Sequence, residues 1–144
     1  GGECFVVRLA PADYHRYGYI DSGRHDGHRK INGFLHSVSP YALRQNLEVF
    51  TQNQREACHL HTDHFGAVTH VDVGALLVGK IVQQQPQSGR FKRGHQKGYF
   101  EFGGSTVILL FEPNTVVPDD DILRYSRRGI ETIVQYGSKI GNKA

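Results

Sequence analysis

Apolar runs and apolar–polar alternation recur along the chain, as expected for β strands that are buried on one or both faces. Aromatic and β-branched residues, which favour strands, are frequent in these stretches. The pattern predicts strands over 4–10, 34–40, 55–62, 67–82 (a strand pair) and the two runs that flank residues 103–106. We therefore expect a β-rich core.

The stretches between these runs predict loops and a helix. Residues 18–33 contain four glycines and alternating charges, which favours a loop or a loose hairpin. Residues 83–97 are polar and basic, and we expect them to form an exposed loop. Residues 41–50 predict one short helix between two strands.

The C-terminal part of the chain predicts a longer helix. Pro118 and the aspartates at 119–121 mark its start, because acidic side chains are favourable at the positive end of a helix dipole. Apolar residues then follow at helical spacing, and Gly137 fits the stop: Leu123, Ile130, Ile133 and Val134. The predicted fold class is mainly β (α+β), a sandwich- or barrel-like core with one C-terminal helix, in a single domain over 1–144.

Composition limits the class of protein further. The 144 residues can bury a real core, and the two cysteines, Cys4 and Cys58, form neither a disulfide framework nor a cysteine-rich zinc motif. No apolar run is long enough to cross a bilayer. The net charge of +3 permits contact with an anionic surface without requiring it. The chain opens in a strand-like run and has no methionine, so we expect a fragment or a processed piece.

Gly103, Gly104, Ser105 and Thr106 separate two runs that both read as buried strand. One interpretation is a glycine-assisted turn or bulge, because glycine readily adopts the positive φ angles of tight reversals. The other is a reactive serine held on a strained loop. The local sequence leaves both interpretations open.

Two further places contain residues that could carry chemistry. Asp13, Tyr14 and His15 follow a proline at a strand end, where a histidine is usually a hydrogen-bonded surface residue. In the second place, His59 and His61 would share one face of a strand. There Asp63 or His64 could complete a zinc-like set of nitrogen and oxygen ligands.

Several segments occur in an order that resembles the phosphatidylserine decarboxylase family. They are RLAPADYHRY, SVSPYAL, NQRE, HFGAVTHVDVGALLVG, RFKRGHQKGYFEFGGSTVILLFEP and IETIVQYGSKIG. The resemblance covers nearly the whole chain and corresponds to the C-terminal catalytic part of that family. The Gly-Gly-Ser-Thr motif is similar to that of the eukaryotic extra-mitochondrial branch and its bacterial relatives.

The resemblance implies a proenzyme that cuts itself between Gly104 and Ser105. Residues 1–104 would become one chain, and residues 105–144 a second chain whose first residue, Ser105, is converted to a pyruvoyl group. This self-made cofactor would form a Schiff base with the substrate amine and accept electrons as CO₂ leaves. The implied reaction converts phosphatidylserine to phosphatidylethanolamine.

The family motif also implies a role for His15 in proton transfer, for which the near-neutral pKa of histidine is suited. A second histidine of that motif is replaced here by Gly18, and the family's orienting aspartate lies upstream of this chain. We expect Gly18 to leave open space at the site, with His25 or His28 from the 18–33 loop available to fill it. Lys80 stands where the family usually has serine.

The implied partners are a phosphatidylserine substrate and a membrane surface, with no nucleic acid. We expect peripheral membrane association through four basic residues: Arg90, Lys92, Arg93 and Lys97. A homodimer and continued association of the two cleaved chains are also expected. We expect no metal ion in the proposed catalytic site. Two alternatives remain, a metal-binding β-barrel protein that uses His59, His61 and His64, and a non-catalytic relative that has lost processing.

Overall fold

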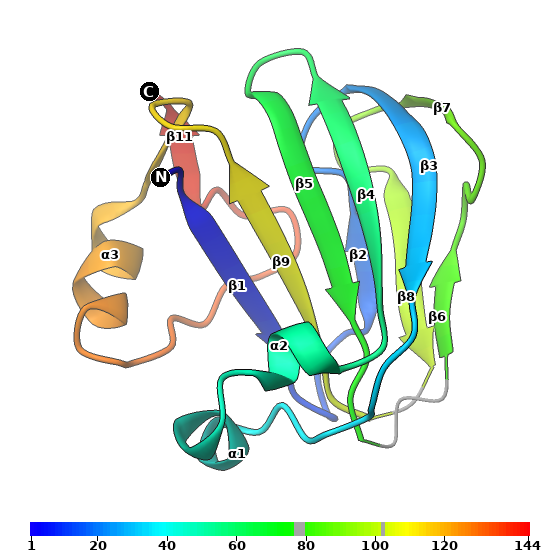
Figure 1. The fold of residues 1–144 in the computed structure, drawn as a ribbon. Coiled ribbons are helices and arrows are strands. Elements are labelled where there is room, and N and C mark those ends of the chain that lie inside the picture. Colours follow the sequence, from blue (N-terminus) through cyan, green and yellow to red (C-terminus); the bar gives the residue numbers. More distant parts are fainter. Residues whose placement is uncertain (77–79, 102) are drawn as a thin grey trace.

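The computed structural model describes residues 1–76, 80–101 and 103–144. The strands of its main sheet are β1 (Cys4–Leu9), β3 (Gly23–Ile31), β4 (Arg55–Thr62), β5 (Gly66–Val73), β7 (Gly89–Phe91) and β9 (Ser105–Phe111). They form an antiparallel sheet in the order β1-β9-β5-β4-β3-β7 (Figure 1). The strands β4, β5 and β9 at its centre coincide closely with predicted ones.

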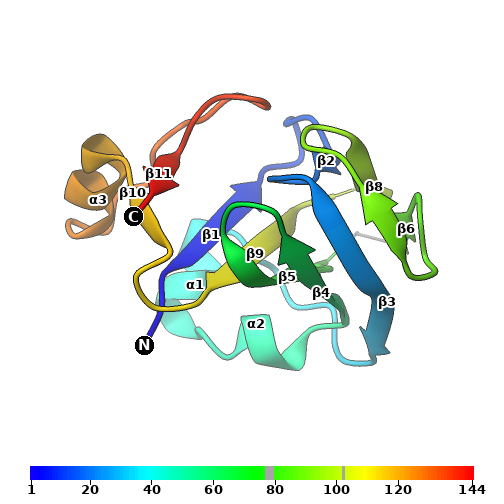
Figure 2. The same ribbon diagram turned by 90° about the horizontal axis from the view of Figure 1, so that it is seen from above.

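A smaller antiparallel sheet packs against one face of the main sheet, as the view from above shows (Figure 2). Its strands, in spatial order, are β2 (Arg16–Gly18), β8 (Gln96–Glu101) and β6 (Lys80–Gln83). The Tyr17 ring bridges the two sheets, with its centroid 5.0 Å from that of Phe100 and 5.7 Å from that of His70. The prediction of a mainly-β, sandwich- or barrel-like core with a helix is therefore confirmed.

The space between the sheets contains a buried ionic network. Lys97 on β8 is fully buried, and its Nζ donates to Asp72 on β5 at 2.7 Å. Burial alone would raise the pKa of the Asp72 carboxyl, but the Lys97 ammonium holds it well below its usual range. The predicted exposed loop over 83–97 is therefore wrong in part: it contains β7 and the start of β8, and Lys97 faces the core.

Two other predictions for the first half of the chain are wrong. Residues 18–33 are largely strand β3, whose glycines accommodate a bulge instead of a loop. The predicted strand over 34–40 is an irregular segment with one isolated bridge, Phe34 to Asn53. The predicted 67–82 strand pair corresponds to β5 and β6, and residues 77–79 between them lie outside the described residues, as does Phe102 after β8.

The predicted helix over 41–50 is divided into α1 (Pro40–Gln45) and α2 (Val49–Gln52). Asn46 ends α1 with extended backbone angles, and its side chain accepts a hydrogen bond from the Glu48 N–H. This local bond competes with the helical pattern, as asparagine side chains often do. The described helices include none that is both long and apolar enough to pass through a membrane.

The C-terminal helix is shorter than predicted. It is α3 (Asp120–Ser126), and Gly129 follows with φ of +68°, in the left-handed region. Residues beyond it are irregular until β11 (Gly141–Lys143) pairs with β10 (Val116–Pro118) beside the edge strand β1 (Figure 1). The apolar spacing was misleading: the residues beyond Gly129 do not form a helix packed on the core, and Ile133 is 97% exposed.

Candidate functional site

Ser105 is the first residue of β9, where it pairs with Leu9 at the end of β1. Its side chain is fully buried. The turn before it depends on Gly103, whose φ of +82° strains residues that carry a Cβ. A Cβ at Gly104 would meet only ordinary contacts at 3.6 Å, from the Leu9 carbonyl oxygen and Val38. The glycine-assisted turn is therefore present, and it leads into a buried serine at the start of a strand; the reactivity of Ser105 stays a prediction.

His15 lies beside Ser105, although ninety positions separate the two residues in the sequence. The His15 Nδ1 and Ser105 Oγ atoms are 3.4 Å apart. His15 stands between β1 and β2, and its carbonyl accepts a hydrogen bond from Phe100 N–H on β8. The His15 Nε2 atom is buried and has no hydrogen-bond partner among the described residues.

Asp13 shapes the connection that carries His15. Its carboxylate accepts a hydrogen bond from the Ala10 N–H at 2.7 Å, and its own N–H donates to the Ala10 carbonyl. These two bonds close a tight turn directly after β1. Asp13 is therefore committed to the backbone of the turn and positions the histidine only through the path of the chain.

The expectation of open space at Gly18 is wrong. A Cβ at this position would overlap the Tyr136 hydroxyl and approach the His95 carbonyl oxygen at 3.0 Å. The Tyr136 hydroxyl is held there by donating to the Gly94 carbonyl at 3.0 Å, and its ring packs edge-on against Tyr14. The C-terminal segment thus fills the space that a histidine side chain would need.

His25 and His28 do not take the place of the missing histidine. Both lie on β3, three strand spacings from β9 in the sheet, which is about 14 Å. The register also places His28 level with Cys58, His70 and Leu109, four residues along β9 from Ser105, or about another 13 Å. Among the described histidines, His15 is the one hydrogen-bonded to Ser105.

The histidines proposed as a zinc-like set do not converge on one point. Instead, each has a separate partner. His59 contacts the Thr69 hydroxyl at 3.0 Å, His61 pairs with Asp26 at 2.7 Å, and His64 pairs with Asp21 at 3.0 Å. The alternative of a metal-binding protein built on these three residues is therefore not favoured.

A cavity of about 410 Å³ opens beside the Gly104–Ser105 bond. It is lined by Arg8, Leu9, Pro11, Ser37, Val38, Ser39, Ala75, Leu76, Gly103 and Gly104. Arg8 makes a two-pronged ion pair with Glu131, at 2.7 Å for each bond, and these hydrogen bonds lower the pKa of the Glu131 carboxyl. Sequence reasoning gave Arg8 no role, although an arginine inside an apolar strand was a usable signal.

Fold and site together define a β domain of two packed sheets and a small strand pair, in which a buried serine at a strand start lies beside a partly buried histidine and near a cavity. Comparison with known families gives a match to the phosphatidylserine decarboxylase family over residues 1–142. The chain belongs to this family, and the resemblance noted from the motifs is confirmed.

Similar curated proteins include three bacterial ones, each named phosphatidylserine decarboxylase proenzyme. The protein from Clostridium perfringens is 47% identical over 143 residues, covering 99% of this chain and 49% of the relative. One from Clostridium botulinum is 48% identical, with 99% and 48% covered. One from Desulfitobacterium hafniense is 44% identical, with 97% and 47% covered. The chain thus spans about half the length of the curated relatives it matches.

Proposed function

We propose that the full-length protein is a pyruvoyl-dependent carboxy-lyase that converts phosphatidylserine to phosphatidylethanolamine and CO₂. It matures by cutting its own chain between Gly104 and Ser105. The observation that carries this proposal is the 3.4 Å approach of His15 Nδ1 to Ser105 Oγ, directly after a glycine turn. The names of the relatives, which describe proenzymes, support the same reading.

Self-cleavage uses groups that this chain brings together. His15 accepts the Ser105 hydroxyl proton while Oγ attacks the Gly104 carbonyl carbon, and the Gly104–Ser105 amide becomes an ester. Loss of the Ser105 Cα proton and of the Gly104 carboxylate from Cβ leaves dehydroalanine, which takes up water and releases ammonia. The product is a pyruvoyl group at the start of β9, and its ketone supplies the electron sink for decarboxylation.

The buried Nε2 atom of His15 has no hydrogen-bond partner among the residues that the structure describes. A histidine that accepts a proton on Nδ1 needs an acceptor for its Nε2–H, because a buried unpaired donor is costly. The family resemblance implies an upstream aspartate for this purpose. We therefore propose that a carboxylate from outside the described residues accepts the Nε2 proton of His15.

After cleavage, the two chains would remain joined through the main sheet. Strand β9 would belong to the smaller chain, yet it pairs with β1 on one side and β5 on the other. Its inward-facing residues Val107 and Leu109 are buried in the core. Breaking one peptide bond leaves these contacts in place, so we propose a tightly associated two-chain enzyme. Formation of a homodimer stays a prediction.

The function is tested with purified full-length protein and vesicles that contain phosphatidylserine. We expect phosphatidylethanolamine and CO₂ to form in equal amounts, and mass spectrometry to show a chain break at Gly104–Ser105 with a blocked new N-terminus. The same protein is offered free serine and free aromatic amino acids. Turnover of a free amino acid alone would overturn the assigned substrate, and an intact, inactive wild-type chain would favour a non-catalytic relative.

We also propose peripheral attachment to the membrane through an apolar rim beside the cavity. The rim consists of Phe34, Leu35, Tyr41 and Leu76, which are exposed at the end of the sheet where β9 begins. Tyr41 is 77% exposed and Leu76 is 55% exposed, and Leu76 also lines the cavity. A lipid whose head group enters this cavity keeps its acyl chains in the bilayer, so an apolar rim there is favourable.

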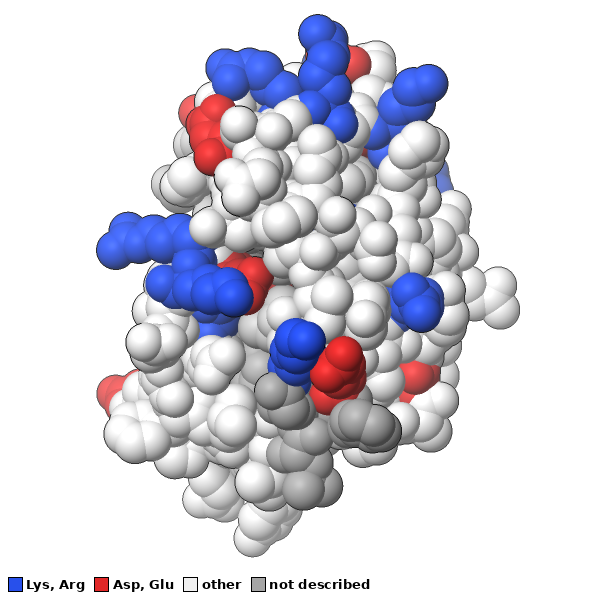
Figure 3. Space-filling model, turned by 90° about the vertical axis from the view of Figure 1, so that its right-hand side faces the viewer, with Lys and Arg blue, Asp and Glu red and all other residues white. Residues whose placement is uncertain are grey.

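The basic loop is a weaker candidate for this contact. Lys97 is buried, so its predicted membrane role is wrong, and Arg93 is paired with Asp21 at 2.7 Å. On the face that carries β6 and β7, basic side chains lie in separate groups with acidic ones among them (Figure 3). Arg90 and Lys92 remain as exposed cations of the loop.

Glutamate at Phe34 or Tyr41 should therefore weaken vesicle binding about 10-fold or more, since burying one large apolar side chain contributes about 1.5–3 kcal/mol. Co-sedimentation with vesicles measures the binding. Val117→Glu, an exposed apolar position on β10, is the matched control and should bind as the wild type does. Equal losses in all three variants, or binding abolished by salt alone, would contradict the rim and favour charge contacts.

A further inference from the structure

His25, His28 and Cys58 form a cluster that the proposed reaction does not use. One potential ligand atom from each residue lies within 4.8 Å of the other two. Among the described residues, this is the set of three metal-ligating side chains that lie this close together. Cys58 is buried and carries a free thiol. The cluster is distinct from the candidate active site, because β4 and β3 lie two and three strand spacings from β9 and the cluster is several residues along the strands from Ser105.

The cluster exists because β3 contains a bulge. In a regular strand, residues three apart point to opposite faces. The register shifts between His25, opposite Leu60, and His28, opposite Cys58, so that two residues of β3 face one residue of β4. Gly27 makes this possible with a φ of +97°. The extra residue turns both histidines to the face that carries Cys58 and Leu60.

The hydrogen bonds leave His28 prepared to bind a ligand. Its Nδ1 is 3.4 Å from the Pro86 carbonyl, which can only accept, so the proton is on Nδ1 and the lone pair is on Nε2. That Nε2 atom is buried and has no partner in the described part of the chain. Metal-binding histidines typically donate their other N–H to a carbonyl or carboxylate in this way.

His25 requires one exchange of partners. One of its ring nitrogens contacts the Tyr19 hydroxyl at 3.3 Å, and the other accepts from the Gly27 N–H at 3.1 Å. Because Nδ1 accepts from Gly27, the ring proton is on Nε2, which faces the Tyr19 hydroxyl. A metal therefore takes the Nδ1 lone pair in place of the Gly27 N–H, and the bond from Nε2–H to Tyr19 then orients the ring. The Tyr19 ring stacks on Phe91, which holds this side of the cluster in place.

We propose that His25, His28 and Cys58 form a structural site for a zinc-like divalent cation. Imidazole nitrogen and thiolate sulfur suit Zn²⁺, whose bond lengths of about 2.0–2.3 Å require the three atoms to converge by about 1 Å. On binding, the Cys58 thiol proton passes to solvent as the sulfur–metal bond forms. The metal would connect the bulge of β3 to β4 and so stabilise this side of the sheet.

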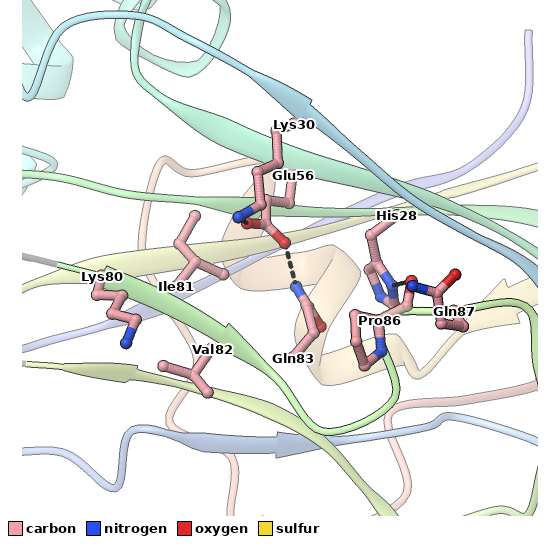
Figure 4. Close-up of a pocket in the computed structure, with 9 residues that line it drawn as sticks. All are labelled: His28, Lys30, Glu56, Lys80, Ile81, Val82, Gln83, Pro86 and Gln87. Carbon is pink, nitrogen blue, oxygen red and sulfur yellow. Dashed lines mark hydrogen bonds and ion pairs between the residues drawn. The ribbon is translucent and has the colours of Figure 1, made fainter.

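The cavity next to His28 provides a path by which an ion can reach the cluster, and space for a water molecule as the fourth ligand. It has a volume of about 440 Å³, and His28, Pro86 and Gln87 lie together at one end of it (Figure 4). Glu56 and Gln83, joined by a hydrogen bond of 3.1 Å, are part of the same lining. Water from this cavity supplies the fourth ligand position that three protein ligands leave open.

The test is titration of the metal-free full-length protein with Co²⁺ and, separately, Zn²⁺. We expect one equivalent of Co²⁺ to give visible bands of tetrahedral cobalt together with a thiolate charge-transfer band, and Zn²⁺ to displace it. Cys58→Ser and His28→Gln should lose the charge-transfer band and stoichiometric binding. Cys4→Ser, which removes the exposed cysteine, and His59→Gln, which alters an exposed histidine, should keep both.

A second measurement on the unmodified protein guards against variants that fail to fold. Bound Zn²⁺ should protect Cys58 from alkylation under mildly denaturing conditions, and Cys4 should react equally with and without the metal. The thermal midpoint should rise with Zn²⁺ concentration in the wild type. Absence of a thiolate band, or of Cys58 protection, or a band that Cys4→Ser removes, would overturn the site. These readouts are independent of decarboxylation and of chain cleavage.

Discussion

Replacing Ser105 with alanine in the full-length protein should abolish both chain cleavage and CO₂ release. Alanine has no oxygen to attack the Gly104 carbonyl and cannot become dehydroalanine, so the pyruvoyl group never forms. The backbone pairing of Ser105 with Leu9 does not depend on the side chain. Loss of the hydroxyl removes one hydrogen bond, worth about 1 kcal/mol, so the variant should still fold.

Denaturing electrophoresis and mass spectrometry measure the cleavage, and labelled CO₂ from phosphatidylserine measures the reaction. Ser126→Ala, at an exposed position at the end of α3, is the matched control and should be cleaved and active. A Ser105→Ala protein that releases CO₂ without being cut would contradict the proposed cofactor. One that is still cut at position 104 would contradict the nucleophile.

Sequence patterns predicted best those strands that pair with a neighbour close in the sequence. Strands β4 and β5 are joined by a tight turn, so alternation in 55–62 and the apolar run after it reflect one shared face. Lys97 shows the opposite case. Its basic neighbours suggested exposure, and the residue that justifies its burial, Asp72, lies 25 positions away on another sheet. No short stretch of the sequence contains both Lys97 and Asp72.

The candidate site also has features that the local sequence indicates and features that depend on residues distant in the sequence. The turn at Gly103 and the buried start of β9 were accessible to local reasoning, whereas the approach of His15 to Ser105 followed from the family resemblance. The open space expected at Gly18 was wrong because Tyr136 fills it from a segment more than a hundred residues later in the chain. That segment was read as a helix, and its actual path along β1, with Glu131 bound to Arg8, is decided by tertiary contacts.

Replacing His15 with alanine should slow self-cleavage by about 10²–10⁴-fold, the usual contribution of a positioned acid–base group. His15 is the described histidine within hydrogen-bond reach of Ser105 Oγ, and His25 and His28 lie too far along the sheet to substitute for it. The measurement is the fraction of chain cut as a function of time after synthesis. His59→Ala, which alters an exposed histidine on β4, should be cut at the wild-type rate.

Hydroxylamine can then locate the step that His15 serves, because it splits an ester between Gly104 and Ser105 but leaves the original amide intact. If His15 accepts the Ser105 proton before the ester forms, hydroxylamine should release no fragment beginning at Ser105 from the His15→Ala protein. Release of that fragment would mean that the ester forms without His15. The histidine would then be needed only for removal of the Ser105 Cα proton, and the 3.4 Å approach to Oγ would serve the later step.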